Sequence, residues 1–166
     1  YRLAPQGHGT MLLEDTFAGL TWMIANAAKL GVHPKRIAVM GESAGGGLAA
    51  GVAILARDRH VPLAKQILIY PMLDDRNTVP DPTIAPFATW TFDNNFTGWS
   101  AVLGKDIGTD RVPAVAAPAR LKDFHGLAPA YIDVGELDIF RDENLVYAQR
   151  LAAARVPVFV DPVPVK

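Results

Sequence analysis

The chain has 166 residues, half of them hydrophobic and a fifth charged, and a formal net charge of -1. This length allows about one domain, and the composition is typical of a folded domain, not a disordered tail. The near-zero charge argues against nucleic-acid binding, and the lack of cysteine excludes disulfides, a thiol nucleophile and a thiolate metal site.

The first part of the chain predicts a helix, a strand and a second helix. Apolar residues recur at helical spacing over residues 14–30, and Gly31 suits the end of that helix. Residues 36–40 form a short apolar run, as buried strands do. Residues 44–58 then predict a helix that begins with several glycines. Glycine destabilises a helix, so this start needs a structural reason.

The remainder continues the alternation of strands and helices. We expect strands over residues 66–70, 130–134 and 156–160, and a helix over residues 142–154. Residues 72–120 are less regular, so they predict a loop-rich insertion. The alternation predicts an α/β domain with a mostly parallel sheet of about four strands and helices on both faces.

No part of the chain predicts a membrane span or an exported protein. The longest run free of charged or strongly polar residues extends over 13 residues, Ala44 to Ala56, and a spanning helix needs about 18 or more. No signal-peptide pattern precedes Tyr1, so we expect a cytoplasmic location.

The most informative segment is Gly41-Glu42-Ser43-Ala44-Gly45, which stands between a predicted strand and a predicted helix. It matches the Gly-x-Ser-x-Gly pattern of a nucleophile elbow, a strained turn that lifts a serine hydroxyl clear of the sheet. Side chains at Gly41 and Gly45 would collide with the neighbouring strand and helix. The backbone N–H of Ala44 is the expected oxyanion donor. The alternative is a glycine-rich turn with an incidental serine.

Two phosphate-binding interpretations of the same glycines fit less well. A P-loop would end in Gly-Lys-Ser/Thr, and no lysine follows Gly46 here. A dinucleotide fingerprint could be aligned with Gly45-x-Gly47, with Asp74 or Asp75 as the ribose-binding acid. That pattern lies inside the predicted helix, and the acid comes later than the expected ~20 residues. Dinucleotide binding therefore stays a remote alternative.

Four motifs occur in order along the chain: Tyr1-Arg2-Leu3-Ala4-Pro5, Glu14-Asp15, Gly41-Glu42-Ser43-Ala44-Gly45-Gly46, and Gly135-Glu136-Leu137-Asp138 with Arg141-Asp142-Glu143. Through them the chain resembles the hormone-sensitive lipase family of α/β-hydrolase carboxylesterases over essentially its whole length. The resemblance implies ester hydrolysis through an acyl-serine and a Ser-Asp-His triad. It makes Ser43 the nucleophile and Asp138 the triad acid, with no metal or organic cofactor.

The position of Asp138 supports the same role independently. It closely follows the strand predicted over residues 130–134, and therefore lies at the rim of the sheet that also carries Ser43. In this fold the nucleophile precedes the acid along the chain, as Ser43 precedes Asp138.

Four other carboxylates are rivals for the acid. We expect Asp133 to face a helix from inside its strand and Glu136 to be an exposed turn residue. Asp142 and Glu143 fit the first turn of a helix, where the helix dipole favours negative charge. None of the four is expected to serve the triad.

The triad histidine is missing from the expected place. It should follow the last strand, and no histidine follows His125. His125 precedes the acid along the chain. We expect His125, His33 and His60 to be surface loop residues. His8 stays a remote candidate because its loop is expected near the rim.

Two family elements thus fall outside the chain. By the resemblance, the triad histidine would follow Lys166, and a His-Gly-Gly oxyanion motif would precede Tyr1. We therefore expect part of a larger α/β-hydrolase domain, cut at both ends, with little turnover alone. A catalytically incompetent fragment or pseudo-enzyme is the alternative. Residues 37–40 would form an exposed edge strand, through which copies could associate.

The irregular segment offers material for a substrate pocket. Six of its residues could line an apolar site: Pro86, Phe87, Trp90, Phe92, Phe96 and Trp99. Each could equally pin the segment onto the core. The absence of a lysine or arginine cluster favours small uncharged esters, and amides or lactones remain alternatives.

Overall fold

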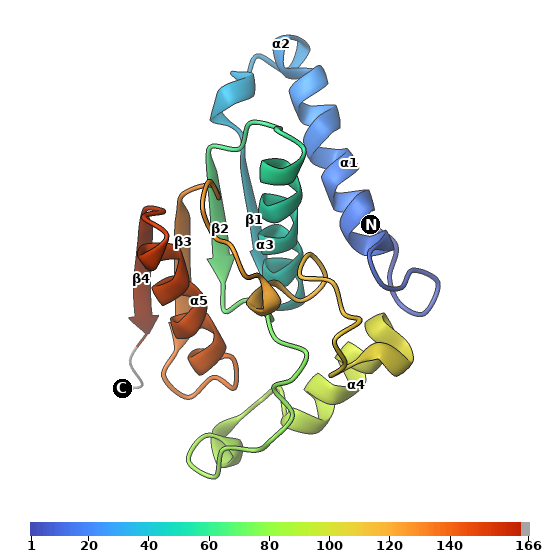
Figure 1. The fold of residues 1–166 in the computed structure, drawn as a ribbon, viewed down its shortest axis with the longest axis vertical. Coiled ribbons are helices and arrows are strands. Elements are labelled where there is room, and N and C mark those ends of the chain that lie inside the picture. Colours follow the sequence, from blue (N-terminus) through green and yellow to red (C-terminus); the bar gives the residue numbers. More distant parts are fainter. Residues whose placement is uncertain (164–166) are drawn as a thin grey trace.

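The structure, a computed structural model that describes residues 1–163, contains one parallel sheet of four strands (Figure 1). The strands are β1 (Ala38–Glu42), β2 (Lys65–Ile69), β3 (Ala130–Gly135) and β4 (Val158–Val163). Their order across the sheet, β1-β2-β3-β4, is the order along the chain. The predicted α/β class and parallel sheet are confirmed.

Within the described residues, five α-helices accompany the sheet: α1 (Met11–Ala25), α2 (Ala27–Leu30), α3 (Ser43–Asp58), α4 (Phe92–Leu103) and α5 (Arg141–Ala153). The predicted first helix is interrupted at Asn26, whose side chain donates to the carbonyl of Trp22 at 2.9 Å. Gly31 ends α2 in the left-handed conformation, as predicted. Within residues 1–163 no helix is long and apolar enough to cross a bilayer.

The first strand begins two residues later than predicted. Residues Pro34–Arg36 form a short 3-10 turn, and the ring of His33 accepts a hydrogen bond from the N–H of Lys35 at 3.1 Å. This turn occupies the first residue of the predicted strand. The strand β1 also ends two residues later than predicted, at Glu42, directly before Ser43.

The helices α3 and α5 both cover the same face of the sheet. One apolar core joins Ile54 of α3 and Leu151 of α5 to Leu68 and Ile132 of the central strands. The expected helices on both faces are therefore not found among the described residues. A right-handed crossover from each strand to its next neighbour always passes over the same face. Helices on both faces would require the strand order to reverse.

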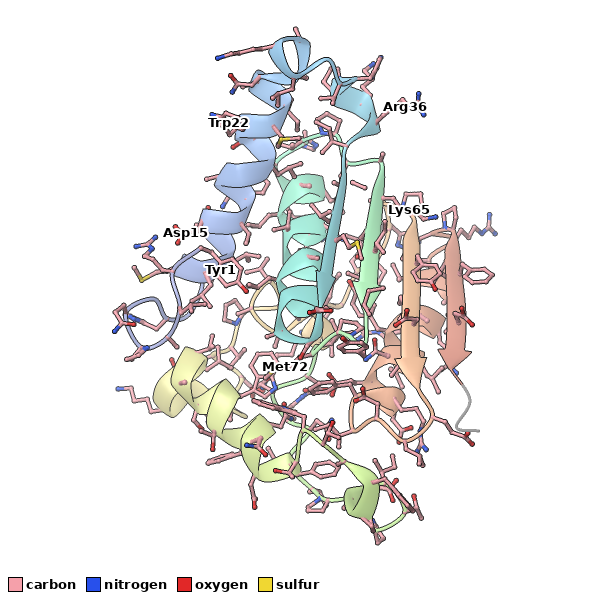
Figure 2. All side chains as sticks on the ribbon, turned by 180° about the vertical axis from the view of Figure 1, so that it is seen from behind. Tyr1, Asp15, Trp22, Arg36, Lys65 and Met72 are labelled. Carbon is pink, nitrogen blue, oxygen red and sulfur yellow. The ribbon has the colours of Figure 1, made fainter. Side chains whose placement is uncertain are left out.

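The opposite face of the sheet carries no helix within residues 1–163. Figure 2 views the molecule from this side, where β1 passes in front of α3. Met40 is 70 % exposed and Phe159 is 60 % exposed, and the ring of Tyr131 stacks on Phe159 at 5.7 Å. Instead of covering this face, α1 packs against α3 through Phe17 and Leu20.

The segment between β2 and β3 is more ordered than the sequence predicts. It contains α4, which begins with a capping box between Thr91 and Asn94, and three short 3-10 turns. A buried ion pair joins Asp75 to Arg120, with nitrogen–oxygen distances of 2.6 and 2.9 Å. The part of the segment that contains α4 lies beyond the carboxyl ends of the strands (Figure 1), where it can bound a site, and its last part packs back onto α3 near Gly51.

Candidate active site

The turn that carries Ser43 has no linker between strand and helix. β1 ends at Glu42 and α3 begins at Ser43, whose φ of +53° lies in the left-handed region. A side chain is strained there, and such strain is found chiefly at functional positions. The Ser43 carbonyl accepts a hydrogen bond from the N–H of Met72 at 3.0 Å. The strained turn predicted from the sequence is present.

Only one of the two glycines that flank Ser43 has the steric role predicted for it. A Cβ at Gly41 would lie 2.1 Å from the carbonyl oxygen of Gly45, so the expected collision is confirmed there. A Cβ at Gly45 would meet nothing within 4 Å, so the collision predicted for that position is wrong. The close approach comes instead at Gly46 and Gly47, which press on the chain after β2.

Ser43 opens onto a cavity of about 420 Å³ at the carboxyl ends of the strands. The residues around it come from the serine turn, the end of β2, the 87–90 segment and the loop after β3. They are Ser43, Tyr70, Phe87, Ala88, Thr89, Trp90, Gly135, Leu137, Asp138, Ile139 and Phe140. The predicted nucleophile and the predicted acid therefore line one cavity.

Asp138 lies in the loop between β3 and α5. Its carboxylate accepts a hydrogen bond from the N–H of Phe140 at 2.9 Å. Burial raises the pKa of Asp138 above its ordinary value, and this hydrogen bond partly opposes the rise. A half-buried carboxylate held by its own loop can orient an imidazole at the cavity.

The backbone around Ser43 also offers an oxyanion donor. Ala44 is the second residue of α3. The first four N–H groups of a helix have no carbonyl partner within it, and the helix dipole places partial positive charge there. The N–H of Ala44 thus belongs to the group that can stabilise negative charge beside Ser43.

The rival carboxylates lie elsewhere. Asp133 is on the uncovered face of β3, opposite Ile69 and Asp161 in the register, so the prediction that it faces a helix is wrong. Glu136 is exposed, as expected. Asp142 is an exposed first-turn residue of α5 paired with the neighbouring arginine.

Glu143 is in the first turn of α5, as predicted, but its carboxylate is enclosed. It accepts hydrogen bonds from the N–H groups of Leu73 at 2.6 Å and Asp74 at 3.1 Å. Its pKa rises to about 8 because burial outweighs these contacts. The sequence showed the residue but gave no sign that it turns inward.

No histidine lines the Ser43 cavity in the part of the chain that the structure describes. His125 is exposed and contacts the carboxylate of Asp123 at 2.7 Å, in the loop that leads into β3. His8 lines a separate cavity beside the end of α4. Neither His125 nor His8 is therefore placed to act as the triad histidine.

Two of the six aromatic or proline candidates line the cavity, namely Phe87 and Trp90. Phe92 and Trp99 are buried in the core of the insertion instead. Tyr70 was missed. Its φ is +34°, and its hydroxyl donates to the Glu42 carboxylate at 3.2 Å. Its signal in the sequence is a tyrosine before a proline at the carboxyl end of a predicted strand.

Comparison with known proteins agrees with this geometry. A family model described as the alpha/beta hydrolase fold matches residues 1–164. The chain belongs to the alpha/beta hydrolase family. Two relatives from Mycobacterium tuberculosis are Carboxylesterase NlhH, 40 % identical over 163 residues, and Esterase LipI, 37 % identical over 164. These matches cover 95 % and 96 % of this chain and 50 % of each relative.

Solved alpha/beta hydrolases have the same fold. A bacterial heroin esterase matches with a TM-score of 0.90 and 42 % identity, over 96 % of this chain and 52 % of that one. The carboxylesterase EstE1, cloned from a metagenomic library, matches with a TM-score of 0.89 and 34 % identity, over 100 % and 57 %. This chain spans about half the length of the curated relatives it matches. The predicted resemblance to carboxylesterases is confirmed.

Two features of the structure argue against the dinucleotide alternative. Gly45 and Gly47 lie inside α3 and form no turn before it. Asp75, one of the two candidate ribose-binding acids, is fully buried and paired with Arg120. A buried carboxylate that already accepts hydrogen bonds from Arg120 is not available to accept one from a ribose hydroxyl.

Proposed function

We propose that this alpha/beta hydrolase acts on carboxylic esters through an acyl-serine at Ser43. One observation carries the proposal. Ser43, in a strained turn at the N-terminus of α3, and Asp138, in the loop after β3, line the same cavity. The named activities of NlhH, LipI and the heroin esterase support ester hydrolysis as the reaction.

The proposed reaction follows from these positions. The Ser43 hydroxyl oxygen attacks the ester carbonyl carbon while its proton passes to a base, and the carbonyl electron pair moves onto oxygen. The N–H of Ala44 donates to this oxyanion. The alcohol leaves with a proton, and water releases the acid by the same steps. Asp138 orients the triad histidine that the resemblance implies, and stabilises its charged form.

We propose small uncharged esters as the substrates. Phe87 and Trp90 give the cavity an aromatic wall, and Asp138 is its one carboxylate among the described lining residues. An apolar wall binds apolar acyl or alcohol groups, whereas Asp138 repels a substrate that carries a carboxylate. The proposal therefore gives residues 72–120 a pocket-forming role.

The test is ester hydrolysis with and without added imidazole. We expect slow turnover of a p-nitrophenyl ester, and an increase when imidazole supplies the base that no described residue brings to the cavity. Ser43→Ala should abolish the protein-dependent part of both rates. If the rates of wild type and Ser43→Ala are equal under both conditions, Ser43 is not the nucleophile and the pseudo-enzyme alternative gains support.

We also propose that copies of the chain associate through the open edge of β1. Within residues 1–163 this strand pairs with β2 on one side only, and Met40 is exposed on it. Unpaired N–H and C=O groups beside apolar side chains favour strand addition. The cytoplasmic location stays a prediction, which cell fractionation would test.

A further inference from the structure

Glu143 has no part in the proposed chemistry, yet both of its carboxylate oxygens accept hydrogen bonds from residues 73–77. One oxygen accepts from the N–H groups of Leu73 and Asp74, and the other accepts from the side-chain amide of Asn77 at 2.8 Å. None of these donors is charged. The carboxylate of α5 therefore holds the segment that leaves β2.

Asn77 extends this contact to the loop of the proposed acid. Its side-chain nitrogen also donates to the carbonyl of Ile139 at 2.8 Å. Ile139 stands between Asp138 and Phe140, and the N–H of Phe140 donates to the Asp138 carboxylate. A single amide group thus joins Glu143 to the residue next to the proposed acid.

The other end of the same segment reaches the nucleophile. Met72 precedes Leu73 and donates its N–H to the carbonyl of Ser43 at 3.0 Å. Residues 72–77 therefore contact the Ser43 turn at one end and the Asp138 loop at the other. Figure 2 shows Met72 just beyond the end of β2.

We propose that Glu143 is a positioning residue, which fixes the Asp138 loop relative to the Ser43 turn by binding residues 73–77. The inference rests on the proposed function, because that function makes Asp138 the triad acid. A merely structural role would stop at the contact between α5 and Leu73. The two hydrogen bonds of the Asn77 side chain, to Glu143 and to Ile139, couple Glu143 to the loop of the acid, and we call them the Asn77 arm.

The neighbouring residue Asn144 attaches α5 to the chain after β2 without the contact between Glu143 and Asn77. Its side-chain nitrogen donates to the carbonyls of Pro71 at 2.8 Å and Phe140 at 2.7 Å. This contact already fastens the first turn of α5 to the chain after β2. Loss of the Glu143–Asn77 contact should therefore loosen the acid loop without detaching α5.

Two variants break the arm from opposite sides. In Glu143→Gln the amide oxygen can still accept from Leu73 and Asp74, but its NH2 group faces the NH2 group of Asn77 and cannot accept from it. Asn77→Ala removes the donor to both Glu143 and Ile139 and leaves Glu143 in place. Asp142→Asn is the matched control, since it removes a carboxylate one residue away that is exposed and contacts Arg141.

The readouts are amide hydrogen exchange at Phe140 and the midpoint of the Asp138 carboxyl titration, both followed by NMR in the full chain. We expect Glu143→Gln and Asn77→Ala each to speed exchange at Phe140 by about two- to tenfold, the loss of one hydrogen bond. Both should displace the Asp138 midpoint in the same direction. The effect of Glu143→Gln should be the smaller of the two, since Asn77→Ala also removes the hydrogen bond to Ile139, and the double variant should go no further than Asn77→Ala.

The control should leave both readouts at their wild-type values. The proposal is overturned if Phe140 exchange and the Asp138 midpoint in Glu143→Gln equal those of Asp142→Asn, even where Asn77→Ala changes them through its own contact with Ile139. Should Glu143→Gln fail to fold, Glu143→Asp decides, because its side chain is one methylene shorter and withdraws the carboxylate from Asn77 while leaving the Asn77–Ile139 hydrogen bond in place. Neither readout needs ester hydrolysis, so an inactive protein would contradict the proposed function and leave this coupling to be judged separately.

Discussion

The backbone at Ser43 is a strained feature of the site at the scale of one residue. Its φ of +53° lies in a region where an L-residue is less stable by about 1–2 kcal/mol and glycine is not. The hydroxyl therefore projects from a position that the surrounding strand and helix hold against the preference of the residue itself.

This strain predicts an unusual order of stability. Ser43→Gly should be more stable than Ser43→Ala by about 0.5–1 kcal/mol, because glycine accepts the left-handed conformation. Urea denaturation at one pH measures the difference. At a position with ordinary helical φ the order would be reversed, so an alanine variant that is the more stable of the two would contradict the strained turn.

The buried carboxylate of Glu143 predicts a dependence of stability on pH. Burial raises its pKa from 4.5 to about 8, so the folded chain favours the protonated form. Its stabilising contribution is therefore complete below about pH 4.5 and is lost as the pH rises through 8. The slope for one group reaches about 1.4 kcal/mol per pH unit.

Glu143→Gln removes this group and keeps its shape. The free energy of unfolding of wild type should thus fall relative to that of Glu143→Gln as the pH is raised from 5 to 8. Urea denaturation at several pH values measures it. Parallel curves for the two proteins would show that the carboxyl is not held neutral by burial.

At the scale of elements, the decisive contact is between α3 and the chain after β2. A Cβ at Gly47 would lie 2.2 Å from the carbonyl oxygen of Met72, whereas a Cβ at Gly45 would meet open space. Both residues lie on α3 two positions apart. They differ in what faces them, which is the backbone of Met72 at Gly47 and open space at Gly45.

This contrast predicts opposite effects of one substitution. Gly47→Ala should destabilise the fold by about 1–3 kcal/mol or more, because backbone must move away. Gly45→Ala should stabilise it by about 0.5–1 kcal/mol through its better helix propensity. Thermal unfolding measures both. Equal effects in the two variants would contradict the close approach of α3 to Met72.

The strands and helices with clear periodicity were predictable, and those that depend on distant contacts were not. The runs that became β2, β3 and α5 were found within about two residues of their bounds. The helix α4 was missed because its sequence holds a glycine and two asparagines, and its apolar face is fixed by the core around Trp99.

The same limit applies to the candidate site. Ser43, Gly41 and Asp138 carry a local pattern, so the sequence placed them together. The inward turn of Glu143 and the close approach of Gly47 depend on the path of residues 71–77, which no local pattern reveals.

At the scale of the whole molecule, the proposed association through β1 predicts a measurable assembly. Wild type should form dimers or larger species in light scattering at raised concentration. Met40→Lys should shift them to monomers, because a charge on an edge strand opposes strand addition. Val79→Lys is the control, since Val79 is 80 % exposed and lies outside the sheet. A wild type that stays monomeric would contradict the proposal.

The order of the strands also sets a distance. Ser43 follows β1 and Asp138 follows β3, with β2 between them. Neighbouring strands lie about 4.8 Å apart, so the two chains that supply the proposed nucleophile and acid are separated by about 10 Å. An imidazole that hydrogen-bonds to both needs an interval of this kind. The strand β2 carries neither group, and its width sets the space between Ser43 and Asp138 in which an imidazole fits.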